Sequence, residues 1–267
     1  MDTITLGLAD GFTIARRNLI RIARVPQIIV GMLVTPILMV LLFSYVFGGS
    51  IDIAGSSYRE YLVAGAFALN LLFGATYAGI GMADDMEKGI ISRFRSLPMS
   101  RAAVVFGRTA SNLVGNALTL AIMALAGLIV GWRVHTDFLD VAMGVALLLA
   151  FAYAISWIMV YVALVVPNVE VVQSVSGLVV FPLTFIANTF VPVENLPTAL
   201  RIIAEWNPVS SVTQAAREFF GNIPAGTPDP TAWPLQNAAL YTLLWAVAIT
   251  ATFAALATRR YRHGRTG

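Results

Sequence analysis

Residues 141–166 read VAMGVALLLAFAYAISWIMVYVALVV, a run that contains no charged side chain. A helix needs about twenty predominantly apolar residues, rising roughly 1.5 Å each, to cross the hydrocarbon core of a bilayer. This run, with Asp140 before it, therefore predicts a membrane-spanning helix. Five more stretches of comparable length and apolarity lie along the chain. The expected spans are 26–47, 60–83, 102–130, 140–166, 171–191 and 235–257.

The composition agrees with an all-α integral membrane protein and excludes an ordinary soluble domain. Hydrophobic residues make up 58% of the chain and charged residues only 12%, about half the charge of a typical soluble domain. The length fits one compact membrane domain, 1–267. The absence of cysteine excludes disulfides and cysteine-based metal sites. The net charge of +3 comes from arginines that flank apolar spans, which favours contact with lipid headgroups over nucleic acid.

Residues 2–24 form an amphipathic pattern and no span. Apolar side chains recur at three- and four-residue spacing, and Arg17, Arg21 and Arg24 share another face. We expect an interfacial helix with its arginines among lipid phosphates; the alternative is a soluble surface helix. No signal-peptide cleavage site follows, so this segment is expected to be retained. The apolar stripe consists of Ile4, Leu8, Phe12, Ala15, Leu19 and Ile22.

Lysine and arginine are distributed unequally between the two sides of the predicted spans. Thirteen fall on the side that carries both termini and the 84–101 loop, and four fall on the other. By the positive-inside rule both termini and this loop are cytoplasmic, in a multi-pass protein of the plasma membrane. The four exceptions are Arg59, Arg133, Arg201 and Arg217.

The loop at 84–101, DDMEKGIISRFRSLPMSR, carries seven charges and the only lysine of the chain, Lys88. Each such charge would cost roughly 2.5 to 3.5 kcal/mol at a bilayer centre, so the loop must lie in water. Its acidic start and basic end favour a helix over about 84–96, which Pro98 would end. Phe94 and Leu97 add apolar contact points. We interpret it as a cytoplasmic handle for a soluble partner; the alternative is an ordinary positive-inside loop.

The segment 192–234 predicts a helical hairpin on the external side. Asn207 followed by Pro208 is typical of a helix start, and helical spacing then continues through Arg217 to Gly221. A shorter helix is expected to end near Trp206. Two short amphipathic helices joined by a sharp turn indicate a re-entrant hairpin that dips into the outer leaflet.

Catalytic and metal-binding patterns are missing. The sequence has no phosphate-binding loop, and its two histidines, His135 and His263, fall on opposite sides of the predicted membrane. Few ionisable residues lie at mid-span, which disfavours an ion-coupled carrier. Neutral polar side chains in the spans form either helix-packing hydrogen bonds or a largely apolar translocation path. They include Asn70, Asn112, Asn116, Gln173 and Asn188.

Two regions resemble the type-2 ATP-binding-cassette export permeases. Glu87-Lys88-Gly89 with RFRSLPMSR at 93–101 resembles that family's E-x-G and R-x-x-P-x-S-R signature. FPLTF at 181–185, FVPVENLP at 190–197 and WNPVS at 206–210 resemble its fifth span and the following hairpin. The subgroup most similar is the daunorubicin-resistance permease type. The chain departs from the family in having Met99 where the usual site reads P-V-S-R, and Ser211 where an aromatic is frequent.

This resemblance implies a six-span permease that pairs with a second permease, identical or different, and with a separate ATPase that holds ATP and Mg²⁺. The chain itself would hold no cofactor or metal and would not be an enzyme. The interfacial helix would also touch the ATPase, and the passenger would be a lipophilic or amphiphilic, drug-like or lipid-like compound leaving the cytoplasm. Two alternatives stay open: export of a polysaccharide or glycolipid, and a membrane assembly subunit without transport. The expected coupling residues are Glu87, Lys88, Gly89, Arg93, Phe94, Arg95, Leu97, Pro98 and Arg101.

Overall fold

A computed structural model of the chain describes residues 3–42, 44–45, 58–96, 100–166, 168–193, 196–223 and 226–263. The regular elements within these ranges are helices. They are α1 (Thr3–Arg24), α2 (Pro26–Leu42), α3 (Tyr58–Glu87), α4 (Ile90–Arg95), α5 (Arg101–Ile129), α6 (Phe138–Val165), α7 (Val169–Phe185), α8 (Thr198–Trp206), α9 (Pro208–Phe220), α10 (Trp233–Gln236) and α11 (Ala238–His263).

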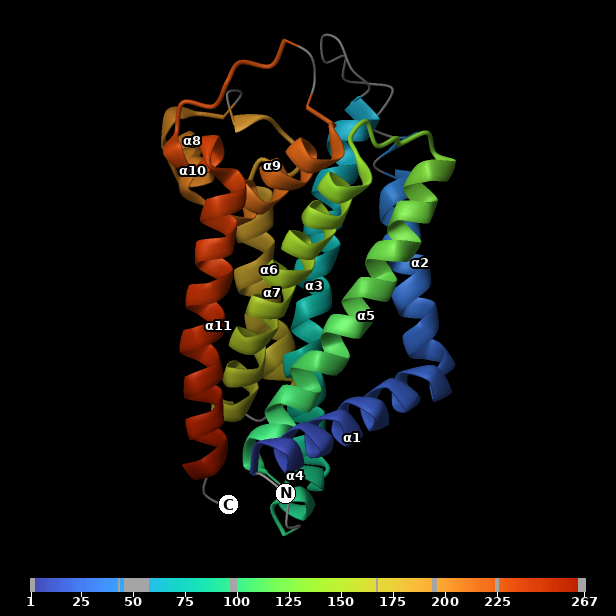
Figure 1. The fold of residues 1–267 in the computed structure, drawn as a ribbon, viewed down its shortest axis with the longest axis vertical. Coiled ribbons are helices and arrows are strands. Elements are labelled where there is room, and N and C mark those ends of the chain that lie inside the picture. The colour runs from blue at the N-terminus through green and yellow to red at the C-terminus, as the bar shows by residue number, and fades with distance from the viewer. Residues whose placement is uncertain are drawn as a thin grey trace.

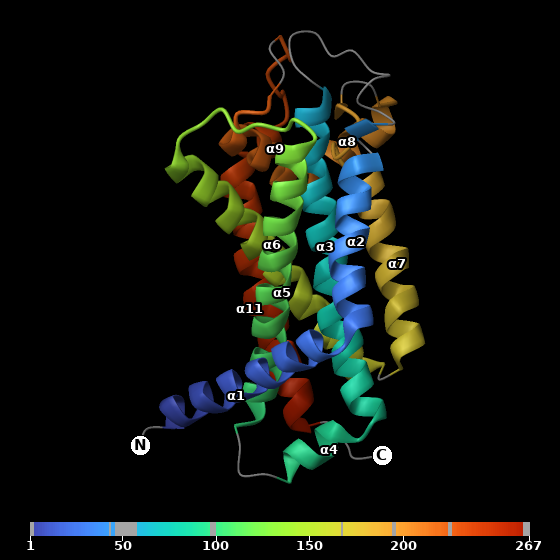
Figure 2. The ribbon, with the colours of Figure 1, turned by 90° about the vertical axis from the view of Figure 1, so that its right-hand side faces the viewer.

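The long helices run side by side along the longest axis of the molecule, and short helices cover both ends (Figure 1). Helices α8, α9 and α10 lie at one end. At the other end α1 runs obliquely across the foot of the bundle and lies near α4, as Figure 2 shows from the side. The start of α1 and the end of α11 both lie at this second end, so the two terminal helices share one side, as the lysine and arginine distribution predicts.

Four helices within the described ranges are long and apolar enough to cross a membrane: α3, α5, α6 and α11. They cover most of the predicted spans 60–83, 102–130, 140–166 and 235–257, and the crossing of a membrane by these helices stays a prediction. Helix α2 covers most of the first predicted span, whose last residues lie outside the described ranges. Pro36 lies inside α2 and Pro182 inside α7.

The predicted span 171–191 is too long, because α7 ends at Phe185 and the chain turns through the next five residues. The backbone carbonyls of Asn188 and Thr189 in this turn accept hydrogen bonds from Arg217 of α9, at 2.8 and 2.9 Å. In a continued helix these carbonyls would accept hydrogen bonds from backbone N–H groups of the next turn. Here the guanidinium of Arg217 donates these hydrogen bonds instead.

Helix α3 is the centre of the bundle. Within its apolar stretch 72% of the residues are buried, against 17% in α11. Glycines let other backbones approach it closely. A Cβ on Gly79 would come within 2.5 Å of the Met159 carbonyl oxygen of α6, and one on Gly65 within 2.0 Å of the Thr189 carbonyl oxygen.

Substitution of Gly79 by alanine tests this close α3–α6 contact. Gly79→Ala should lower the midpoint of thermal unfolding in detergent, because the methyl group overpacks the interface at a cost of about 1–3 kcal/mol. Gly177→Ala in α7 is the matched control. A Cβ at Gly177 meets nothing within 4 Å, so alanine should leave the midpoint unchanged or raise it through helix propensity. Equal midpoints for Gly79→Ala and the unsubstituted protein would contradict the contact.

Candidate functional site

The charged segment after α3 is folded differently from the single helix expected over 84–96. Helix α3 continues through Asp84 and Asp85 to Glu87, and a tight turn at Lys88 and Gly89 separates it from α4. Gly89 has φ +67°, a left-handed conformation that glycine adopts without steric cost. The predicted helix is therefore wrong, because its acidic start completes a span and only its basic part forms α4. Leu97 and Pro98 lie outside the described residues.

Helix α4 is anchored by one side chain and presents another outward. Ile91 is buried in an apolar cluster with Met82 of α3 and Val104 of α5. Arg93 is exposed, and Phe94 is half-buried. The guanidinium carbon of Arg17 lies 5.2 Å from the centroid of the Phe94 ring. The side chains of Arg95 and Arg101 lie outside the described ones. Lys88 is exposed and pairs with Asp84 through Nζ at 2.6 Å.

Above α4 lies a cluster of opposite charges centred on Asp85, whose side chain is only 3% exposed. Its Oδ2 accepts a short hydrogen bond from Nη2 of Arg108 on α5. Its Oδ1 lies 3.2 Å from Nη2 of Arg17 and 3.6 Å from Nη1 of Arg21, both on α1. One buried carboxylate thus holds three helices together. We call the set Asp84, Asp85, Arg17, Arg21, Lys88 and Arg108 the charge cluster.

Arg108 reaches Asp85 because α3 leaves room for it. Its Nη2 also donates to the Gly81 carbonyl at 2.9 Å. A Cβ on Gly81 would approach Nη1 of Arg108 to 2.5 Å, so the glycine provides the space that the guanidinium occupies. Removal of one partner from such a buried pair leaves the other charge uncompensated, which is the costly case for buried ions.

Helix α1, which the sequence predicts to lie at the membrane interface, also packs directly against α5. Ile14 is buried, and Asn18 Nδ2 donates to Ser111 Oγ of α5 at 3.2 Å. Asp10 Oδ2 accepts from the Ser100 N–H at the start of α5, at 3.0 Å. A Cβ on Gly107 would come within 2.7 Å of the Gly11 carbonyl oxygen, so the two helices cross at very close range.

This docking changes the expectation for the α1 arginines. Arg21 Nη2 lies 2.7 Å from Asp84 Oδ2, and Arg17 pairs with Asp85. These two side chains therefore bind acidic residues of α3, and a contact of the partly exposed guanidinium groups with lipid phosphates stays a prediction. Arg24 is exposed. Phe12, on the predicted apolar stripe, is also exposed, which fits a surface that lipid can cover.

Glu87 connects the end of α3 to the start of α7. Its Oε1 accepts a hydrogen bond from the Val169 N–H at 2.8 Å, at a helix N-terminus where negative charge is stabilising. The residue is exposed, and a contact with a partner subunit stays a prediction.

Within the described residues no group of three or more histidine, aspartate or glutamate side chains could hold a metal ion.

The polar residues of the predicted path are not gathered along one route. Asn112 Nδ2 donates to the Gly74 carbonyl of α3 at 2.9 Å, and Asn116 is buried beside it. Asn70 donates to its own helix, at Ala66. Gln173 is exposed on α7, and Asn188 is buried in the turn after α7. The α5 asparagines therefore pack α5 against α3, and a path role for any of the five stays a prediction.

The hairpin α8–α9 agrees with the sequence in its turns. Asn207 Oδ1 accepts from the Val209 N–H at 2.9 Å, and Pro208 opens α9. Gly221 ends α9 with φ +69°.

Burial by neighbouring protein atoms raises the pKa of Glu218 on this helix. Gln214 Nε2 donates a hydrogen bond to its carboxylate at 3.1 Å, which offsets part of the rise.

Arg217, which the sequence places on the external side, is buried in protein, with 1% of its surface exposed. Its guanidinium donates to the carbonyls of Tyr61, Asn188 and Thr189 and lies 3.4 Å from the Tyr61 ring centroid. The charge cluster and Arg217 are the functional features that sequence reasoning missed. One signal in the sequence could have revealed the charge cluster. Arg108 lies inside the predicted span 102–130, near its cytoplasmic end, and Asp84 and Asp85 lie at the same end of the neighbouring span.

A double-mutant cycle tests the Asp85–Arg108 pair. Asp85→Leu should lower the stability of the solubilised protein by about 3–5 kcal/mol, because it strands a buried guanidinium. Adding Arg108→Met removes the stranded charge and should recover most of that loss. Thermal unfolding in detergent measures both variants. A double variant that is no more stable than Asp85→Leu would show that the pair is not coupled.

Comparison with known proteins places this architecture in a family. The profile of the ABC-2 type transporter family matches residues 11–220. The chain is 29% identical to the daunorubicin resistance ABC transporter permease protein DrrB1 of Streptomyces coeruleorubidus over 194 residues, covering 73% of this chain and 69% of that protein. It is 25% identical to the probable doxorubicin resistance ABC transporter permease protein DrrC of Mycobacterium tuberculosis over 210 residues, covering 76% and 74%. The family match spans α1 to α9, so the chain belongs to the ABC-2 type transporter family.

Proposed function

We propose that this protein is the membrane permease subunit of an exporter that moves a lipophilic or amphiphilic, drug-like compound out of the cytoplasm. A separate ATPase subunit would supply the energy, with ATP and Mg²⁺ bound there. The observation that carries the proposal is α4, a short helix with exposed Arg93 and half-buried Phe94 at the end of the bundle that holds both termini. The printed names of two relatives, both drug resistance permeases, support the passenger class.

The contacts around α4 provide a route by which force could spread through the permease. A push on α4 reaches α3 through Ile91 and the Gly89 turn. It reaches α1 and α5 through Asp85, and α7 through Glu87. Because these contacts are buried ion pairs or hydrogen bonds at helix ends, the four helices should move together. The partner subunit would set this block in motion on nucleotide binding and hydrolysis.

The proposed topology has six spans, α2, α3, α5, α6, α7 and α11, with α4 and both termini in the cytoplasm of a plasma membrane protein. The hairpin α8–α9 then lies on the external side. Ile202, Ile203 and Trp206 of α8 are exposed, which supports the proposal that this hairpin dips into the outer leaflet. A second permease chain, identical in the simplest case, would complete the path between two subunits.

Single cysteines test this orientation against a background that contains none. Ser92 of α4 and Thr231 before α10 are both exposed. A membrane-impermeant maleimide should label Thr231→Cys in intact cells and should label Ser92→Cys only after the membrane is opened. Labelling of Ser92→Cys in intact cells would invert the topology and remove α4 from the reach of a cytoplasmic ATPase.

Charge reversal on α4 tests the coupling role. Arg93→Glu should reduce both co-purification of the ATPase and passenger-stimulated ATP turnover by about tenfold, the loss expected for one charged contact of about 1.4 kcal/mol. Membrane insertion and thermal unfolding should be unchanged, because Arg93 is exposed.

Arg259→Glu on α11 is the matched control, since it reverses an exposed arginine at the same end of the bundle. It should leave ATPase co-purification and turnover intact. Full coupling in Arg93→Glu, or an equal loss in both variants, would contradict the assignment of α4 as the contact point.

A further inference from the structure

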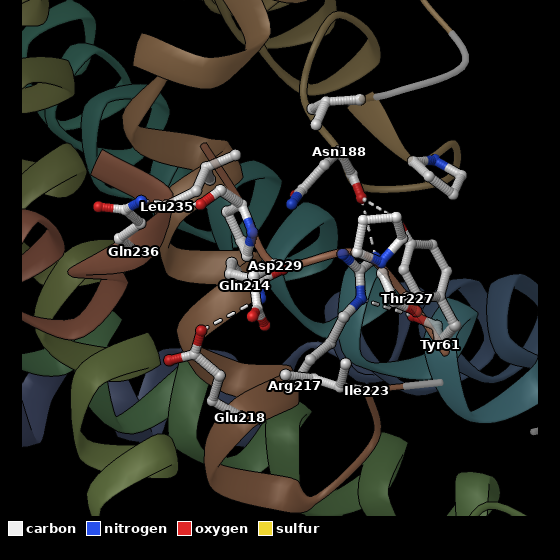
Figure 3. Close-up of a pocket in the computed structure, with 14 residues that line it drawn as sticks. Tyr61, Asn188, Gln214, Arg217, Glu218, Ile223, Thr227, Asp229, Leu235 and Gln236 are labelled. Atoms are coloured by element: carbon white, nitrogen blue, oxygen red, sulfur yellow. Dashed lines mark hydrogen bonds between the residues drawn. The ribbon is translucent and has the colours of Figure 1, made fainter. Parts of the chain in front are cut away.

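A pocket of about 330 Å³ lies beside α9, at the end of the bundle opposite α4 (Figure 3). Its walls come from α3, the α7–α8 connection, α9, the loop 226–230 and α10. Val193, Ile223 and Leu235 contribute apolar surface. The volume is at the lower limit of small-molecule sites, so the pocket has room for one end of a drug-sized molecule.

The charged groups that line this pocket are Glu218, Asp229 and Arg217. Arg217 is committed elsewhere: its guanidinium stacks on the Tyr61 ring and donates to three backbone carbonyls. Figure 3 shows it directed toward Tyr61, while the hydrogen-bonded Gln214 and Glu218 lie on another side of the pocket. Arg217 keeps its positive charge, so the charged groups that line the pocket sum to a formal charge of −1, and the side with Glu218 favours a cationic group over an anionic one.

Asn188 adds a second and independent feature. The residue is only 3% exposed and lines the pocket. Its side-chain Oδ1 is buried and has no hydrogen-bond partner within the described residues. Buried amides are normally paired, and one without a partner points to a missing ligand or water. Rotation of the amide by half a turn would present either its oxygen or its NH₂ group to the pocket.

The apolar lining residues, the two carboxylates and the Asn188 amide together favour one chemical class of ligand. We propose that this pocket binds the protonated amine end of an amphiphilic molecule. The ammonium group would lie between Glu218 and Asp229, a hydroxyl or carbonyl group would pair with the Asn188 amide, and adjoining carbon atoms would contact Val193, Ile223 and Leu235.

The site deepens the proposed export function, because an external pocket of this kind would hold the passenger as it leaves. That step rests on the proposed function. The binding chemistry of the pocket does not, and it can be measured on this chain alone. The raised pKa of Glu218 fits the same picture, since a carboxylate crowded by protein gains more from a nearby cation than a fully hydrated one does.

A pair of fluorescent probes tests the proposal on the full chain in detergent. Dansylcadaverine carries an apolar ring system and a primary amine, and its N-acetylated derivative keeps the ring but lacks the charge. Fluorescence anisotropy, corrected for probe in empty micelles, measures binding of each. We expect the amine to bind and the acetylated probe to bind at least about tenfold more weakly, the loss of one charge-assisted hydrogen bond.

Glu218→Gln should weaken binding of the amine by about tenfold while leaving binding of the acetylated probe unchanged. Asp137→Asn is the matched control: it removes an exposed carboxylate that does not line the pocket, from a helix N-cap that asparagine also fills. If Glu218→Gln fails to fold, Asp229→Asn gives the same reading.

Equal binding of the two probes, or an equal loss in Glu218→Gln and Asp137→Asn, would overturn the proposal. These results are separate from the coupling test, because no ATPase is present. If Arg93→Glu couples normally but the unsubstituted protein prefers the amine probe, the export proposal fails and the pocket proposal stands. If Arg93→Glu loses coupling but the protein shows no preference for the amine probe, the pocket proposal fails and the export proposal stands.

Discussion

Three arginines converge on the carboxylate of Asp85, and the arrangement of one whole end of the molecule depends on that convergence. A buried carboxylate needs compensation, and it receives it from α5 through Arg108 and from α1 through Arg17 and Arg21. Helix α1 is thereby fixed across the foot of the bundle. Its arginine Arg17 in turn covers Phe94 of α4. The helix proposed as the partner's contact therefore packs against three helices, α1, α3 and α5, that Asp85 joins by charge.

The opposite end is organised by a different use of arginine. Arg217 has carbonyl groups and an aromatic ring as partners, and these come from α3 and from the turn after α7. Between the two ends α3 is packed through glycines, with Gly79 against α6 and Gly65 against the same turn. Polar contacts therefore fix both ends of the bundle, and close backbone packing joins them through the apolar middle.

Much of this fold follows from the sequence. Apolar run length gives the positions of α3, α5, α6 and α11, since burial in lipid leaves few other options for such segments. Local turn chemistry gives the start of α9 at Asn207 and its end at Gly221, because caps depend on neighbouring residues alone. The pairing of Asp85 with Arg108 could not be obtained this way. It joins residues 23 positions apart, and only the packing of α3 against α5 decides which charges meet.

The break after the charged end of α3 and the burial of Arg217 escaped prediction for the same reason. Acidic residues at 84–87 suit the end of one helix or the start of another, and the tertiary contacts of Asp85 select the first. Arg217 fits an exposed helix face equally well on sequence alone. Two of its three carbonyl partners, those of Asn188 and Thr189, are available because α7 stops early, and that stop is itself a tertiary feature.

The early end of α7 also has a consequence for the surrounding lipid. As the fifth span of the proposed topology, α7 with its 17 residues would reach only about 26 Å, less than the roughly 30 Å thickness of a typical hydrocarbon core. Hydrophobic mismatch of this kind is relieved by thinning the adjacent bilayer, at a modest cost per ångström. The leaflet beside α7 should therefore be depressed toward the hairpin, which shortens the distance that an amphiphile must travel between lipid and the pocket next to α9.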